Sequence, residues 1–136
     1  MTEQPTPGQA ARVENVVTEA CTAAAFAQDP GERFPAVLAT PFLIADLERA
    51  CALMLTPLLK PGQLSVGAQI DVRHLAPTGV SGRYTAHAVF VEKSGPLFWF
   101  DVRAEDSVGP IAKGRIARAI VDEADILARG SKAAGR

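Results

Sequence analysis

One long apolar stretch, from Thr40 to Pro57, constrains the fold of this chain more than any other feature. A helix that is apolar nearly all round is typical of one enclosed by other structure. Thr40 followed by Pro41 predicts the helix start, with the threonine as N-cap and the proline at the first helical position, and Pro57 predicts its end. The rest of the chain must therefore supply a cover for this helix. Only three residues of the stretch are charged, namely Asp46, Glu48 and Arg49.

The carboxylate of Glu48 stands in an apolar stripe of this predicted helix. By helical periodicity Asp46 and Arg49 share another side. A lone buried charge costs several kcal/mol unless it is paired, neutralised or used, and acids in such places are candidates for raised pKa and catalysis. Two interpretations of Glu48 stay open here: a structural acid satisfied by a backbone N–H or an arginine, and a catalytic acid. The neighbours of Glu48 three and four positions away are Ile44, Ala45, Cys51 and Ala52.

After the helix the pattern changes to alternating strands joined by short turns. The segment Cys21–Ala27 is ambiguous between a short strand and a helical turn, and Asp122–Arg129 predicts a short terminal helix. A segregated α+β order with one buried helix predicts an antiparallel sheet wrapped round that helix, which is the hot-dog architecture. Such a sheet has open edges that commonly pair across a two-fold axis, so we expect a homodimer. The predicted strands are Arg12–Thr18, Leu64–Leu75, Gly82–Glu92, Leu97–Glu105 and Pro110–Val121.

Length and charge bound the class of protein. A chain of 136 residues predicts one domain, at residues 11–129, with flexible tails at 1–10 and 130–136. The net charge of −1 favours neither nucleic acid nor an anionic membrane as a partner. Cys21 and Cys51 form neither a disulfide framework nor a metal-ligand spacing, and they fit a reducing cytoplasm. No window approaches the roughly 18 apolar residues of a membrane span, and no cofactor or metal motif is present.

A second ionisable side chain points toward the predicted interior. His74 falls on the apolar face of its strand, where a histidine taken alone is more often a core residue than a catalytic one. Together with Glu48 the balance changes, because a histidine and a glutamate in one enclosed site can share acid and base roles. Thr40 adds a hydroxyl at the helix start, which can serve as a helix cap, as a chemical group or as both. His87 has the opposite parity to Phe90 and is expected to be exposed.

These residues belong to a longer pattern at 34–80, which reads FPAVLATPFLIADLERACALMLTPLLKPGQLSVGAQIDVRHLAPTGV. The run resembles the fluoroacetyl-CoA thioesterase-like family of the hot-dog superfamily, with its FPxVxAT, a Glu eight residues after that Thr, a PG turn, and an SxG strand ending in His. The resemblance continues more weakly to about Val121. It implies thioester hydrolysis by Thr40, Glu48 and His74, with Glu48 as nucleophile or as the base that activates water. His74, aligned with Thr40, would polarise the thioester or handle protons.

The resemblance also implies substrate contacts. The backbone N–H near Gly67, where no side chain obstructs approach, is a candidate donor to the developing oxyanion. Phe34 matches an aromatic that in this family helps to gate the acyl pocket. Arg118, with Lys113 and Arg115, is placed to meet the phosphates of coenzyme A, although a solvated strand face is expected for at least one of the three.

Departures from the family pattern bear on the substrate. Pro41 replaces the usual glycine after the threonine, Gly31 replaces a second lid aromatic, and the segment Cys21–Phe26 is rich in small residues. We therefore expect a wider acyl pocket and a short-chain acyl-CoA substrate whose acyl group is like that of fluoroacetyl-CoA or somewhat larger. The leading hypothesis is an acyl-CoA thioesterase. The alternatives are a hot-dog hydratase or dehydratase, and a non-catalytic module that binds acyl-CoA or an acyl carrier.

Overall fold

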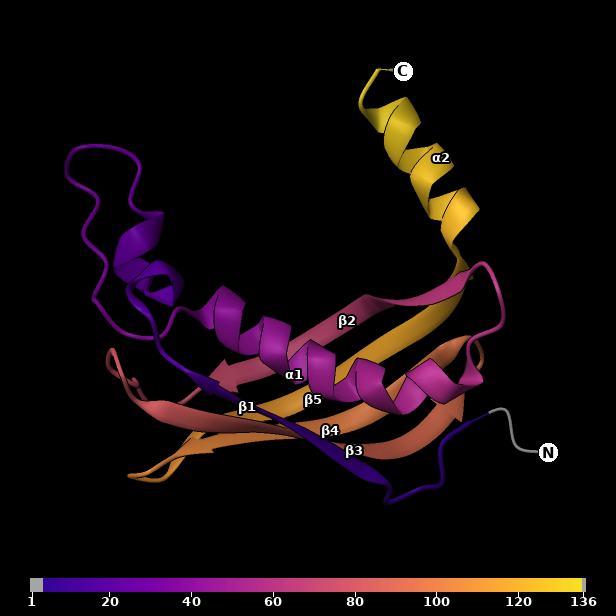
Figure 1. Cartoon of the computed structure of the whole chain (residues 1–136), viewed down its shortest axis with the longest axis horizontal. Helices are drawn as coiled ribbons and strands as arrows, with labels where there is room; N and C mark the ends of the chain where they lie inside the picture. The colour runs from indigo at the N-terminus through magenta and orange to yellow at the C-terminus, as the bar shows by residue number, and fades with distance from the viewer. Residues whose placement is uncertain (1–3, 136) are drawn as a thin grey trace.

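The computed structural model describes residues 4–135 of the chain. The chain forms five strands, a long helix and a second helix near the C-terminus, and Figure 1 shows the long helix lying against the strands. The predicted long helix and all five predicted strands are confirmed, with bounds that shift by a few residues. The ambiguous segment Cys21–Ala27 lies in two short 3-10 turns, η1 (Glu19–Cys21) and η2 (Ala23–Phe26). The remaining elements are β1 (Ala10–Val16), α1 (Thr40–Leu55), η3 (Thr56–Leu58), β2 (Gln63–His74), β3 (Arg83–Ser94), β4 (Leu97–Asp106), β5 (Pro110–Asp122) and α2 (Glu123–Ala133).

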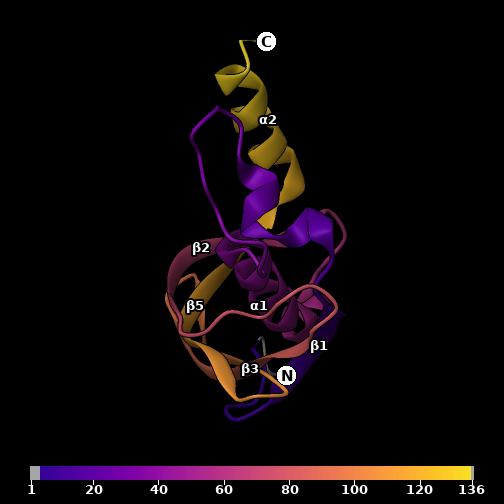
Figure 2. The same cartoon turned by 90° about the vertical axis from the view of Figure 1, so that its left-hand side faces the viewer.

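The five strands form one antiparallel sheet in the order β1-β3-β4-β5-β2. The sheet curls round α1, as the end-on view in Figure 2 shows. This arrangement confirms the predicted α+β hot-dog fold. β1 and β2 are the two edges of the sheet, and β2 is the edge that carries Gly67 and His74.

The core lies between α1 and the inner face of the sheet. Leu43, Leu47 and Ala50 recur at helical spacing on α1 and are fully buried. Opposite them β3 presents alanines at Ala86 and Ala88, both buried, which lack the bulk that would hold the helix away. Burying a leucine contributes about 1.5–3 kcal/mol relative to leaving it exposed, so this seam fixes α1 against the sheet.

The start of α1 differs from the prediction by one residue. Ala39, with extended backbone, is the N-cap, and Thr40 is the first helical residue. The carbonyl of Ala39 accepts hydrogen bonds from the N–H groups of Phe42 and Leu43, both at 3.1 Å. Thr40 as N-cap is therefore wrong, because Ala39 takes the capping position without a side-chain bond and leaves the threonine hydroxyl available elsewhere.

Asp46 is the more deeply buried acid of α1, with 5% of its surface exposed. It accepts hydrogen bonds from Asn15 Nδ2 at 3.0 Å, from Arg49 Nη1 at 2.9 Å and from the Tyr84 hydroxyl. Burial, together with the adjacent Asp46, raises the pKa of the Tyr84 hydroxyl above its usual range. The bond to Arg49 confirms that these two residues share a side of the helix, and the full network ties α1 to β1 and β3.

Both ends of the described chain carry more structure than the sequence indicates. Gly8 N–H donates to Phe90 O at 2.9 Å, and Phe90 N–H donates to Gln9 O at 2.8 Å, so pairing with β3 begins within the predicted tail 1–10. At the other end α2 continues to Ala133, inside the predicted tail 130–136. Residues 1–3 and 136 lie outside the described residues. Among residues 4–135, no helix has the length and apolar character that a membrane crossing requires.

Candidate active site

Thr40 and His74 meet where the first residue of α1 faces the last residue of β2. Thr40 Oγ1 and His74 Nδ1 are 2.8 Å apart, and the proton lies on either atom according to the tautomer of the ring. His74 Nε2 is buried and has no hydrogen-bond partner among residues 4–135. A buried polar atom without a partner is costly, so the arrangement holds one ring nitrogen fixed and leaves the other for a bound group.

Glu48 lies two turns further along α1 and has an arginine partner. Arg118 Nη1, on β5, donates to Glu48 Oε1 at 3.0 Å. The same guanidinium donates from Nη2 to Ser65 O at 2.8 Å and from Nε to Ser65 Oγ at 3.2 Å. The side chain of Arg118 is 11% exposed and that of Glu48 is 28% exposed. The carboxylate is thus positioned by an ion pair while part of it stays accessible.

Gly67 makes room for that carboxylate. A Cβ built on Gly67 would lie 2.0 Å from Glu48 Oε1, which is far inside any contact that real side chains show. In the pairing of β2 with β5, Gly67 is opposite Arg118, and the register shifts between Gly67 and Gln69. A bulge of this kind turns the strand locally and re-aims its side chains. Glu48 thus borders the space beside Gly67 in which the oxyanion is expected. The Gly67 N–H as a donor to that oxyanion stays a prediction.

The two groups lie at separate points along the seam between α1 and β2. Thr40 and Glu48 are eight residues apart on the helix, which corresponds to about 12 Å along its axis. No hydrogen bond within residues 4–135 joins the pair of Thr40 and His74 to Glu48. The structure therefore brings Thr40 to His74, and Glu48 to Gly67 and Arg118, but it does not bring all three predicted catalytic residues into one contact within a single chain.

Cys51 lies one turn after Glu48 and is fully buried. Burial raises the pKa of its thiol to about 12, with Arg118 opposing the shift and Glu48 adding to it. A thiol held neutral in this way is a poor nucleophile. Cys51 therefore packs beside the ion pair without taking part in covalent chemistry.

Phe34 stands on an exposed segment directly before α1, with 46% of its surface exposed. We call η1, η2 and residues 27–39 the lid segment. Its inner end is fixed, since Ala39 N–H donates to Cys21 O at 2.9 Å and Leu38 N–H donates to Thr78 O at 2.8 Å. Phe26 and Phe42, which the sequence analysis did not single out, pack together with ring centroids 5.8 Å apart and ring planes tilted by 34°. Their spacing in the sequence does not predict this contact, because Phe26 belongs to the lid segment, which has no regular period, and Phe42 lies on α1.

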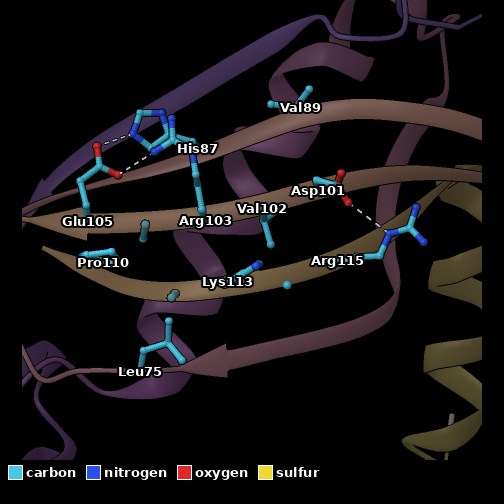
Figure 3. Close-up of a pocket in the computed structure, with 13 residues that line it drawn as sticks. Leu75, His87, Val89, Asp101, Val102, Arg103, Glu105, Pro110, Lys113 and Arg115 are labelled. Carbon is cyan, nitrogen blue, oxygen red and sulfur yellow. Dashed lines mark hydrogen bonds and ion pairs between the residues drawn. The ribbon is translucent and has the colours of Figure 1, made fainter.

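A groove of about 780 Å³ lies on the outer face of the sheet, away from α1 (Figure 3). Lys113 and Arg115 line it, and Arg115 pairs with Asp101 at 3.2 Å. His87 also lines it and is bonded to Glu105 at 2.7 Å, with 18% of its side chain exposed, so it is less exposed than predicted. Lys113 and Arg115 therefore face away from Arg118, which points inward from the same strand.

Comparisons with known proteins indicate the family of the chain. The family profile described as fluoroacetyl-CoA-specific thioesterase matches residues 17–124. The fluoroacetyl-CoA thioesterase of Streptantibioticus cattleyicolor is 38% identical over 90 residues, which cover 65% of this chain and 63% of that protein. A solved structure of the fluoroacetyl-CoA thioesterase FlK superposes with a TM-score of 0.87 at 29% identity, covering 93% of this chain and 96% of that one.

A thioesterase superfamily member from Thermus thermophilus has the same fold, with a TM-score of 0.83 at 25% identity over 96% of this chain and 94% of that one. Within residues 4–135, no three His, Cys, Asp or Glu side chains gather as a metal site. The profile match spans every residue of the candidate site, from Phe34 to Arg118. The chain belongs to the fluoroacetyl-CoA-specific thioesterase family.

Proposed function

We propose that this protein is an acyl-CoA thioesterase that hydrolyses a short-chain acyl-CoA to the free acid and coenzyme A. The observation that carries the proposal is the Glu48 carboxylate, which is seated against Gly67 and held by Arg118 between α1 and β2 of a hot-dog fold. The names of the relatives, fluoroacetyl-CoA thioesterases, support the same substrate class. Relatives and geometry thus point to one reaction, cleavage of a thioester bond by water.

Glu48 has two routes to that cleavage. As a base, its free oxygen takes a proton from water while the water oxygen attacks the thioester carbonyl carbon. As a nucleophile, the carboxylate attacks that carbon itself, and water then hydrolyses the resulting anhydride. In both routes the C–S bond breaks and the thiolate of coenzyme A takes a proton. In the homodimer proposed below, where antiparallel β2 edges bring the sites of the two chains together, His74 Nε2 supplies or relays that proton, with Thr40 fixing the ring through Nδ1.

Arg118 acts in this proposal on the carboxylate. Its Nε, Nη1 and Nη2 atoms all donate to Glu48 or Ser65 and its side chain is only 11% exposed, so a single N–H of the guanidinium is left for the phosphates of coenzyme A. Gly67 N–H remains the proposed donor to the oxyanion, and Phe34 remains the proposed gate of the acyl pocket. Arg118 is therefore proposed as a positioning residue that orients Glu48.

The site is proposed to lie near the interface of a homodimer formed through the β2 edges. β2 is a 12-residue edge strand, and long open edges are ready templates for pairing. Ile70 on this edge is 41% exposed, and an apolar side chain at that position favours burial against a copy. We also propose a cytoplasmic location, because Cys21 and Cys51 are both free thiols.

The test is a panel of acyl-CoA esters with a thiol-detecting reagent, run on the wild type and on Glu48→Gln. Release of free thiol that depends on Glu48 is the expected result. A change in an acyl double bond without thiol release would instead identify a hydratase or dehydratase. Saturable binding with neither reaction would identify a binding module and refute the proposal.

A further inference from the structure

α2 carries an apolar stripe that no other described residue covers. Ile126 is 43% exposed and Leu127 is 61% exposed, and no residue of the helix is buried. By helical spacing Gly130 and Ala133 continue this stripe, whereas Asp125 and Lys132 occupy the opposite face. An isolated helix of fewer than about 12 residues is marginal in water. An 11-residue helix with this pattern is therefore expected to pack on an apolar surface.

The position of α2 shows where that surface must lie. α2 begins beside the first residue of β2, since Asp122 pairs with Gln63 and Glu123 N–H donates to Gly62 O at 2.9 Å. Figures 1 and 2 both show α2 extending past the β2 edge, into the space where another strand would add to the sheet. The lid segment extends past the same edge, but at the other end of α1, near His74.

A two-fold dimer through β2 brings these two projections together. When two copies of β2 pair antiparallel, the first residue of one strand lies near the last residue of the other. The α2 end of one protomer thereby meets the lid end of its partner, and the partner's α2 meets the first lid in return. The lid segment offers matching apolar surface, because Phe26 is 43% exposed and Phe34 is 46% exposed.

We propose that α2 of each protomer packs on the lid segment of its partner, with Ile126 and Leu127 against the partner's Phe26 and the partner's Phe34. The inference rests on the proposed function for one point only, that the lid segment covers an acyl site. Its geometry rests on the proposed dimer. The cover of each acyl site is then built from two chains, and α2 takes part in selecting the acyl group. α2 lies almost wholly beyond the family match, which ends at residue 124.

Chemical cross-linking between two differently tagged proteins tests the packing. One protein carries Leu127→Cys and the other carries Phe34→Cys, both in a Cys21→Ser background in which the buried Cys51 remains. After exchange of subunits, a short bis-maleimide should join the two tags into one covalent product. The matched control replaces Phe34→Cys by Ser94→Cys. Ser94 lies at the α2 end of its own sheet, so in the partner it lies at the far end, and no joined product should form.

Activity provides a second measurement with its own control. Ile126→Ser with Leu127→Ser should leave the β2-paired dimer intact by light scattering, but should raise KM and flatten the preference among acyl-CoA esters. Asp125→Asn with Lys132→Gln changes the opposite face of α2 and should leave both unchanged. A dimeric protein with no joined product, or a monomeric protein, would overturn the inference. A joined product in a protein that releases no thiol would refute the proposed function and leave the inference standing.

Discussion

Replacing Gly67 by alanine is the sharpest perturbation of the proposed site, because it adds one methyl group where the Glu48 carboxylate sits. The added Cβ would lie 2.0 Å from Glu48 Oε1 and 3.7 Å from Arg118 Nη1. Heavy atoms in ordinary contact are about 3.5 Å apart, so the oxygen must retreat by about 1.5 Å. The displacement is accommodated by the end of a flexible side chain, and the backbone of β2 is expected to keep its path.

The size of the effect on stability follows from the hydrogen bond that the Glu48 oxygen loses. Its bond to Arg118 at 3.0 Å would be broken, and a hydrogen bond between charged groups is worth about 1.5–3 kcal/mol. Arg118 keeps its bonds to Ser65, and Glu48 is partly exposed to water, so we expect a loss of about 1 kcal/mol in the free energy of unfolding. Catalysis is more sensitive, because a misplacement of about 1 Å can cost about 10²-fold in rate.

The assay is kcat on the best acyl-CoA ester beside thermal melts of the same proteins. Gly79→Ala is the matched control, because a Cβ at Gly79 meets nothing within 4 Å. We expect Gly67→Ala to lose about 10²-fold in kcat while Gly79→Ala stays within a few-fold of wild type. A folded Gly67→Ala protein with the turnover of the control would refute the placement of Glu48 in the mechanism.

Four further predictions concern the same site and its surroundings. Glu48→Gln and His74→Ala should each lower kcat by at least ~10²-fold, and the double variant should lose much less than the product of the two, whereas fully multiplicative losses would show that they act independently. Glu48→Gln should also lower the melting temperature, because Arg118 then stays buried without its counter-charge. Because burial raises the pKa of Cys51 from 9.0 to about 12, its contribution to stability is complete below pH 9 and is lost as the pH rises toward 12. Denaturant melts at pH 8 and pH 10 should show roughly 1.4 kcal/mol more loss for wild type than for Cys51→Ala, and equal losses would contradict this. Acetyl-CoA and propionyl-CoA should be hydrolysed at least as well as fluoroacetyl-CoA, with a graded preference because a methylene is worth about 1–3 kcal/mol; strict selectivity for fluoroacetyl-CoA would count against the wider pocket.

The fold was accessible from sequence because its signals are local. α1 is apolar nearly all round, and β3 and β4 alternate strictly, with Tyr84, Ala86, Phe98 and Phe100 all turned into the core. Alternation and helix signals of this strength predict element type directly. A single buried helix and several hairpin-linked strands then leave few architectures open.

The geometry around Glu48 depends on contacts between distant parts of the chain, which no local sequence pattern predicts. The alternation in the sequence predicts that Ser65 and Gly67 lie on the face of β2 opposite to His74. In the structure all three residues lie on the inner side of the sheet. The register shift after Gly67 exchanges the two faces within one strand. The partner of Glu48 is Arg118, 70 residues away, so the interpretation of Glu48 as an acid satisfied by an arginine was open in the sequence but could not be assigned.

The burial of Asp46 was hidden for the same reason. Its hydrogen-bond partners Asn15 and Tyr84 lie 31 and 38 residues away along the chain. A helical period indicates which residues share a side, and it does so correctly for Asp46 and Arg49. It does not indicate whether a side faces water or a polar partner from two other strands.

The strand order β1-β3-β4-β5-β2 has a consequence for how the protein folds during synthesis. β1 emerges first but pairs only with β3, where Ala10 meets Val89. α1 and β2 follow, and β2 has no partner in the sheet until β5 has been made. Pairings this distant in sequence slow folding, and the apolar side chains of Leu43 and Leu47 stay exposed until the sheet is complete. The nascent chain is therefore expected to remain open to aggregation and chaperone binding until β5 enters between β4 and β2 and closes the sheet around the helix in one late step.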